Sequence, residues 1–112
     1  MCSHYQGIKR PEAYREIFKA KPPAMEGNED MWPCYLGSFI RRHPHADVGD
    51  EAVPPHEALF GQYGLVPHWA DALKLGRHTH NARSETVSIK PSFRDAWRQA
   101  RHCIIPAMAI YE

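Results

Sequence analysis

The second residue of the chain, Cys2, could do chemistry that no internal cysteine can do. If Met1 is removed, the chain begins with two neighbouring nucleophiles, the α-amine and the thiol. Their reference pKa values are about 7.7–8.0 and about 8.5, so part of each is reactive near neutral pH. An aldehyde could form a Schiff base with the amine, and the thiol could then close a five-membered thiazolidine. The alternative is an ordinary small apolar residue near a frayed terminus.

A second group of polar side chains lies in residues 80–86, which read HNARSET. If this stretch is extended, Asn81, Arg83 and Glu85 point to one face. Asn81 could hold a backbone group or a substrate oxygen, and Arg83 offers the bidentate fork that suits phosphate. A solvated loop or edge strand would explain the same residues, and this pattern alone favours that interpretation.

Two further positions could contribute to a site. Trp69 follows a proline and a histidine, and beside a turn it could stack on an unpaired base, whereas Trp97 is expected in the core. Glu112 follows an apolar stretch, and a carboxylate with apolar neighbours can act as a proton carrier. The simpler interpretation of Glu112 is the first polar residue after a strand.

The histidines and cysteines do not predict a metal site or a disulfide framework. Two pairs, His43 with His45 and His78 with His80, have a spacing that could share a strand face. Zinc needs at least three protein ligands, and the spacing identifies no third one. The chain has three cysteines and no CxxC pair. We therefore expect no metal and no cofactor.

The composition bounds the class of protein. The chain has 112 residues, which suits one domain over residues 1–112. No apolar run is long enough to span a membrane, and no signal peptide is recognisable, so a cytoplasmic location is expected. The net charge is only +1, which excludes a global polycation, so any basic surface must be local.

The hydrophobic spacing predicts a mixture of helices and strands. The predicted helices are 11–20, 71–75 and 92–101, and the predicted strands are 34–42, 58–66 and 101–112. Pro11 suits a first helical turn, Ser92 is the expected N-cap, and Gly64 indicates a bulge or a close backbone approach. The chain stops directly after an apolar stretch, so we expect the front part of a longer protein.

Four blocks of sequence, in order, resemble the SOS response-associated peptidase (SRAP) family, the abasic-site processing proteins. These are the initial Met-Cys, residues 63–70 (YGLVPHWA), residues 81–86 (NARSET), and residues 93–112 with the W…RHCIIPA…YE pattern. The resemblance spans nearly all of this chain but only about the front half of a family member. It implies an α+β fold with a mixed, mainly antiparallel sheet in a partial barrel, flanked by helices.

The resemblance also implies a reaction. Cys2 would capture the ring-opened aldehyde of an abasic site in single-stranded DNA, as a thiazolidine crosslink that protects the lesion during the SOS response. Asn81 would position the N-terminal residue and the deoxyribose, and Glu112 would handle protons. The family is also associated with autoproteolytic removal of the residues before the cysteine, a peptidase activity beside the lyase-type chemistry.

The resemblance implies DNA contacts elsewhere in the chain. Arg83 would contact a flanking phosphate, Trp69 would lie in the DNA-facing wall, and Pro33 would line the same pocket. His4 stands where an arginine is usual, so DNA binding could be weaker or more dependent on pH. Tyr63 stands where a tryptophan is usual. The family's distal histidine lies beyond residue 112.

Two other functions stay open. One is a truncated, non-catalytic domain that binds single-stranded DNA, and the other is a cysteine peptidase that uses Cys2. A covalent adduct that depends on the DNA strand would distinguish the crosslinking protein from the non-catalytic DNA-binding domain. Turnover of a peptide would identify the cysteine peptidase. In each case we expect a monomer without membrane contact, associated with the nucleoid if the cell is bacterial.

Overall fold

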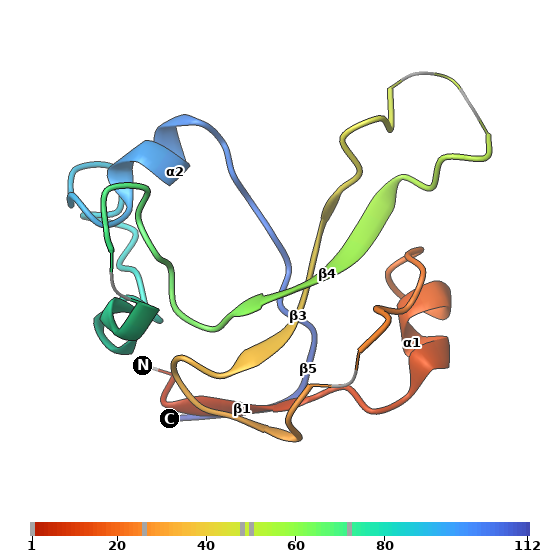
Figure 1. The fold of residues 1–112 in the computed structure, drawn as a ribbon, viewed down its shortest axis with the longest axis horizontal. Coiled ribbons are helices and arrows are strands. Elements are labelled where there is room, and N and C mark those ends of the chain that lie inside the picture. Colours follow the sequence, from red (N-terminus) through yellow and green to blue (C-terminus); the bar gives the residue numbers. More distant parts are fainter. Residues whose placement is uncertain (1, 26, 48, 50, 72) are drawn as a thin grey trace.

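Over the residues that the structure describes, the chain forms five strands and three short helical segments, and the strands make two antiparallel sheets (Figure 1). The computed structural model describes residues 2–25, 27–47, 49, 51–71 and 73–112. The expected removal of Met1 therefore lies outside the described residues. None of the helices in the described ranges is long and apolar enough to cross a bilayer.

A three-stranded sheet joins the two ends of the chain. Strand β1 (His4–Gly7) lies between β2 (Asp30–Met31) and β5 (Ala107–Tyr111), and both pairings are antiparallel. The Ser3 backbone N–H continues the pairing by donating to the Tyr111 carbonyl over 2.8 Å. Figure 1 shows both chain ends at the same end of this sheet. The first residues are thus held by backbone hydrogen bonds.

The second sheet is a hairpin of β3 (Leu36–Arg42) and β4 (His56–Gln62). A β-bridge between Ile40 and Ile104 ties β3 to the stretch before β5, through two backbone hydrogen bonds of 2.7 and 2.8 Å. Gly37 leaves room in β3 for the end of the Met31 side chain, which would have to shift if this residue carried a Cβ. Strand β3 can therefore approach the first sheet closely.

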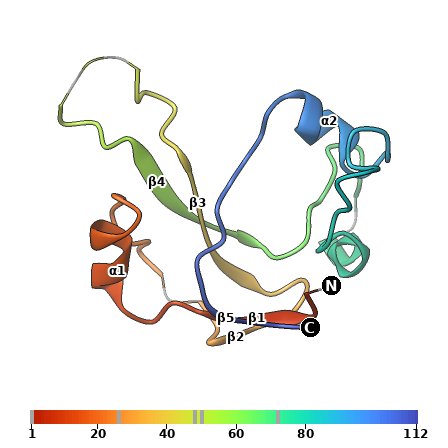
Figure 2. The same ribbon diagram turned by 180° about the vertical axis from the view of Figure 1, so that it is seen from behind.

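The helical segments are short and lie on both sides of the strands (Figure 2). They are α1 (Pro11–Glu16), the 3₁₀ helix η1 (Leu73–His78) and α2 (Arg94–Arg98). Helix α1 starts at Pro11 as predicted. The prediction for α2 was wrong in two details: its N-cap is Phe93 without a side-chain hydrogen bond, not Ser92, and Trp97 is 51% exposed rather than in the core.

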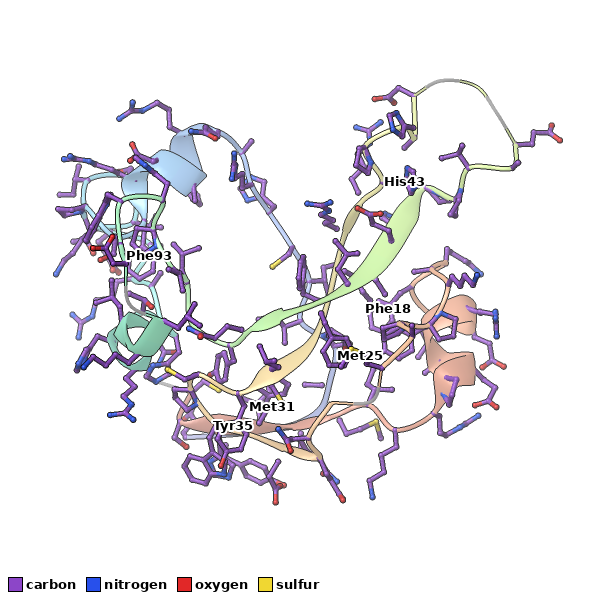
Figure 3. The ribbon with its side chains drawn as sticks, in the orientation of Figure 1. Phe18, Met25, Met31, Tyr35, His43 and Phe93 are labelled. Carbon is purple, nitrogen blue, oxygen red and sulfur yellow. The ribbon has the colours of Figure 1, made fainter. Side chains whose placement is uncertain are left out.

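The buried core is small and lies between the two sheets. Tyr5, Met31 and Tyr63 form its main cluster, and the rings of Tyr5 and Tyr63 meet edge to face at 5.0 Å. Figure 3 labels Met31 beside β1 and β3. This cluster connects the first strand to the segment after β4, and so to the residues that surround Cys2.

The α+β class and the mainly antiparallel pairing are confirmed, and the sheets do not close into a barrel. The predicted strand 58–66 ends at Gln62, and the chain then turns through Gly64 at φ +116°. The expected close approach is present at this glycine, because a Cβ on it would collide with the backbone of Gly76. Strands β1 and β2 were not predicted from the sequence.

Candidate active site around Cys2

Cys2 lies two residues before β1, is half-buried and packs against the Tyr5–Met31–Tyr63 cluster. The Asn81 Nδ2 donates to the Cys2 carbonyl over 2.8 Å, and the Tyr63 hydroxyl donates to the Cys2 sulfur over 3.3 Å. The thiol itself faces the His4 carbonyl at 3.5 Å. Backbone and side chain of Cys2 are therefore both oriented by hydrogen bonds.

Tyr63 is the residue that sequence reasoning missed as a part of this site. Its side chain is buried, and burial together with the hydrogen bond to Cys2 raises the pKa of its hydroxyl well above the ordinary value. Burial likewise raises the pKa of Tyr5 to about 12, with smaller contributions from Tyr14 and Cys2. Both hydroxyls thus stay protonated at neutral pH, and Tyr63 acts as a hydrogen-bond donor toward the sulfur.

Asn81 reaches Cys2 from a loop that follows η1. The condition for a common face of Asn81, Arg83 and Glu85, an extended segment, is not met, and the loop that the pattern alone favoured is observed. The Arg83 carbonyl accepts backbone hydrogen bonds from residues 86 and 87, over 3.1 and 2.9 Å. Arg83 and Glu85 are exposed, while Asn81 is half-buried against the first strand.

His4 is stacked between two aromatic rings. Its ring lies 4.0 Å from the ring of Trp32 and 4.5 Å from that of Tyr111, nearly parallel to both. The Ser3 hydroxyl lies 3.0 Å from its Nδ1 atom. The ring thus closes the end of the sheet beside Cys2. Pro33 follows Trp32 in the loop before β3 and is half-buried.

His80, next to Asn81, is close to the same cluster. Its ring meets the Tyr63 ring edge to face at 5.7 Å. Its Nδ1 atom is buried and has no hydrogen-bond partner within the described residues. A buried nitrogen of this kind is available for a further polar group.

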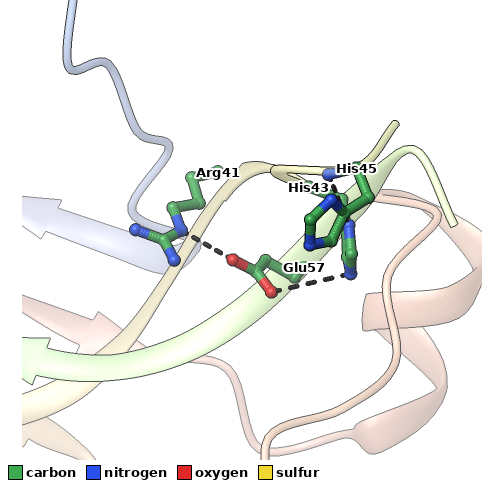
Figure 4. A network of polar contacts seen from close by, with 4 residues as sticks. All are labelled: Arg41, His43, His45 and Glu57. Atoms are coloured by element: carbon green, nitrogen blue, oxygen red, sulfur yellow. Dashed lines mark hydrogen bonds and ion pairs between the residues drawn. The ribbon is translucent and has the colours of Figure 1, made fainter. Parts of the chain in front are cut away.

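The pair of His43 and His45 makes contacts of another kind. Figure 4 shows His43 beside Glu57, with Nε2 at 3.9 Å from the carboxylate, while Arg41 donates to the same carboxylate over 2.7 Å. The His43 Nδ1 accepts from the backbone N–H of His45 over 3.1 Å. Over the residues that the structure describes, no three His, Cys, Asp or Glu side chains are grouped as metal ligands would be.

The family model described as SOS response associated peptidase (SRAP) matches residues 1–112. The chain belongs to the SRAP family. A mouse relative, "Abasic site processing protein HMCES" from Mus musculus, is 31% identical over 110 residues, which are 96% of this chain and 30% of that protein. From Bacillus subtilis (strain 168), "Abasic site processing protein YoqW" is 51% identical over 51 residues, 46% of this chain and 22% of that protein.

A crystal structure from Bordetella bronchiseptica shares the fold with a TM-score of 0.78 at 45% sequence identity. The match covers 99% of this SRAP chain and 50% of the Bordetella chain. The chain thus spans less than a third of these two curated relatives and half of the solved one.

This SRAP chain brings some of the predicted site residues together. Asn81 contacts Cys2 directly. Glu112 is exposed and follows Tyr111, whose ring stacks on His4, so Glu112 lies at the Cys2 end of the sheet.

Trp69 and Arg83 lie in the segment that carries η1 and α2. Trp69 is 51% exposed, and its indole N–H donates to the Pro91 carbonyl over 3.4 Å. Within the described part of the chain, the side-chain hydrogen bonds to Cys2 come from Asn81 and Tyr63. The donors to Cys2 therefore do not include Trp69, Arg83 or Pro33.

Proposed function

We propose that this chain recognises abasic sites in single-stranded DNA and captures them covalently through Cys2. The observation that carries the proposal is the pair of hydrogen bonds that holds Cys2, from Asn81 to its carbonyl and from Tyr63 to its sulfur. The names of the relatives from mouse and Bacillus subtilis support the same lesion as the substrate.

The reaction uses both nucleophiles of an N-terminal cysteine. After hydrolytic removal of Met1, the α-amine attacks the aldehyde carbon of the ring-opened deoxyribose, and water leaves as the imine forms. The Cys2 sulfur then adds to the imine carbon, and the thiol proton passes to the nitrogen. The product is a thiazolidine that joins protein and DNA with the net loss of one water.

The surrounding residues have distinct parts in this proposal. Asn81 fixes the backbone of Cys2 so that the amine and the thiol approach one carbon, and Tyr63 directs the sulfur. Glu112, exposed at the same end of the sheet, carries protons during imine formation. His4, in its aromatic stack, borders the lesion.

The DNA strand would be held mainly by the exposed side chains of the turn-rich segment. Arg83 suits a phosphate, and Trp69 offers an apolar surface to the strand. These contacts position the DNA without reading its sequence, which suits a lesion that has lost its base. We place this activity in the cytoplasm, at the nucleoid in a bacterial cell.

Intact-mass spectrometry tests the proposal. The protein is mixed with single-stranded DNA that carries one abasic site, and with undamaged DNA as the control. The expected adduct has the mass of the protein without Met1 plus the DNA minus one water. It should disappear in Cys2→Ala and persist in Cys34→Ala, a half-buried cysteine that serves as the matched control.

Absence of an adduct from protein whose N-terminus is verified as Cys2 would contradict covalent capture. DNA binding that persists without an adduct would then favour the non-catalytic alternative. Turnover of a peptide that depends on Cys2 would favour the peptidase alternative.

A further inference from the structure

Three aromatic side chains form a column on the outer face of the three-stranded sheet, here called the ring column (Trp32, His4 and Tyr111). The His4 ring is tilted by only 9° from the ring of Trp32 and by 20° from that of Tyr111. His4 and Tyr111 are partners in the pairing of β1 with β5, one position away from the partners Tyr5 and Ile110. Because neighbouring side chains of a strand point to opposite faces, the ring column lies on the face away from the covered face with the buried Tyr5.

Trp32 is an open end of the ring column. It is 45% exposed, and within the described part of the chain its ring contact is with His4. One side of the indole is thus covered by the imidazole, and the exposure leaves the other side to a further flat ring. Nucleobases are rings of this kind, and they stack on aromatic side chains because every base has a π-face.

The ring column is ordered before anything binds to it. The Ser3 hydroxyl lies 3.0 Å from the His4 Nδ1 and donates to the Tyr111 carbonyl over 3.2 Å. The carbonyl of Trp32 accepts from the Tyr35 backbone N–H over 3.0 Å. Side chains that are already fixed lose little conformational entropy on binding, so a base that adds to the column gains most of the stacking free energy.

The surroundings of the ring column suit one base at the Cys2 end of the sheet. The carbonyl of His4 faces the Cys2 thiol at 3.5 Å, so the column begins beside the nucleophile. Asp30 lies two residues before Trp32, and side chains two apart share a face. A strand that continued along β2 would bring its phosphates toward this carboxylate. The column therefore fits a single base rather than a longer path across the sheet.

We infer that the open side of Trp32 stacks on the nucleobase next to the abasic site, a role that the family resemblance does not give to Trp32. The inference rests on the proposed function, because this base belongs to the strand whose lesion reaches Cys2. His4 stands where an arginine is usual, and its flat ring completes the column instead of supplying a fixed charge. Stacking accepts every base but is stronger for a larger ring, so a purine is the preferred neighbour.

Binding to an abasic analogue tests this inference without the crosslinking reaction. The lesion in each single-stranded oligonucleotide is a tetrahydrofuran, which has no aldehyde and forms no imine. Its 5′ or its 3′ neighbour is adenine, thymine or a second tetrahydrofuran, and fluorescence anisotropy gives the Kd. On one of the two sides, we expect the Kd to rise from adenine to thymine to tetrahydrofuran, by about fivefold or more overall.

Matched variants locate the contact. Trp32→Ala should raise the Kd for the adenine oligonucleotide about fivefold or more, and removal of the neighbouring base should then cost nothing further. Trp32→Phe keeps a ring and should retain part of the dependence on the base, which a purely structural role would not predict. Trp97→Ala removes an indole of similar exposure, 51%, from α2 and should keep the full dependence.

Two results would overturn the inference. One is a Kd that does not depend on the neighbouring base on either side of the lesion. The other is an equal dependence in Trp32→Ala and in the unchanged protein, since the base would then stack elsewhere. Both results leave covalent capture by Cys2 untouched. A missing adduct with an intact dependence on the base and on Trp32 would instead reject the capture and support the stacking site.

Discussion

The sheet that carries Cys2 and the turn-rich lobe (residues 64–102) are stabilised in different ways. In the sheet, backbone pairing of β1 with two strands places Tyr5 and Met31 in the core. In the lobe, large apolar side chains such as Trp69, Leu73 and Trp97 are 51–69% exposed, and turns supply most of the order. The comparison teaches that the nucleophile lies on the rigid part, while Trp69 and Arg83, which are proposed to contact DNA, lie on the more adaptable part.

Asn81 connects the two regions, because it belongs to the lobe and bonds to the backbone of Cys2. A lobe with few buried side chains is expected to open at lower free energy than the sheet. Such opening would break the contact from Asn81 and release the backbone of Cys2.

The largest effect is expected from loss of core packing under the sheet. Met31→Ala should lower the free energy of unfolding by about 2–5 kcal/mol, because a fully buried methionine leaves a cavity. Met108→Ala removes the same side chain from an exposed position and should change it by less than about 0.5 kcal/mol. Urea unfolding followed by circular dichroism measures both, and equal losses would contradict a packed core around Met31 on the covered face of the sheet.

Asn81→Ala should lower the crosslinking rate and leave the stability of the fold nearly unchanged. Loss of the hydrogen bond to the Cys2 carbonyl frees the backbone of the nucleophile. We expect a crosslinking rate about tenfold lower, which corresponds to an activation free energy about 1.4 kcal/mol higher. Single-turnover crosslinking measures the rate, and the unfolding midpoint should change little. Ser84→Ala, at an exposed position in the same loop, is the control. An unchanged rate in Asn81→Ala would mean that the contact is incidental.

Tyr63→Phe should have a smaller effect. The ring and its packing remain, but the hydroxyl that donates to the Cys2 sulfur is lost, so the sulfur is oriented less well. The single-turnover crosslinking rate at pH 7 should fall about 3- to 10-fold. Tyr5→Phe removes a buried hydroxyl from the same cluster and should leave the rate unchanged. An equal fall in both variants would indicate a structural role alone.

The smallest effect concerns a polar contact within the lobe. The hydrogen bond from His68, at 2.8 Å, with the nearby Arg98 and Arg94, holds the pKa of Asp95 below its usual value. A carboxyl whose pKa is lowered by folding stabilises the folded state at pH values above its pKa in the unfolded chain, about 3.9. This contribution is lost as the pH falls through the pKa of the folded state. Asp95→Asn should therefore lower the Tm slightly at pH 7 and not at pH 2.5. An equal difference at both pH values would contradict the role of this charge.

The sequence predicted those parts of the fold that carry strong local signals. Pro11 marked the start of α1, and the apolar residues of β3 marked a strand. Strands β1 and β2 are only four and two residues long, so their pairing depends on distant partners and leaves no periodicity to detect. Trp97 was misplaced because its apolar neighbours suggested a buried helix face, whereas the helix is short and that face is open.

The candidate site was predicted in part. Cys2 and Asn81 were named from the sequence, and the structure joins them by a hydrogen bond. The supposed common face of Asn81, Arg83 and Glu85 failed because turns at Arg83 replace the extended conformation. Tyr63 was noted only as a departure from the family pattern, since its contact with Cys2 spans 61 positions and no local spacing encodes it.

In the proposed adduct, both nucleophiles of Cys2 bond to one carbon of the lesion. Alkylation of the purified adduct with iodoacetamide, followed by peptide mapping, tests it most directly. We predict that the denatured adduct is alkylated at Cys34 and Cys103 and not at Cys2, because the Cys2 sulfur is held in a thiazolidine. Alkylation of Cys2 in the adduct would show a free thiol and would contradict the claim.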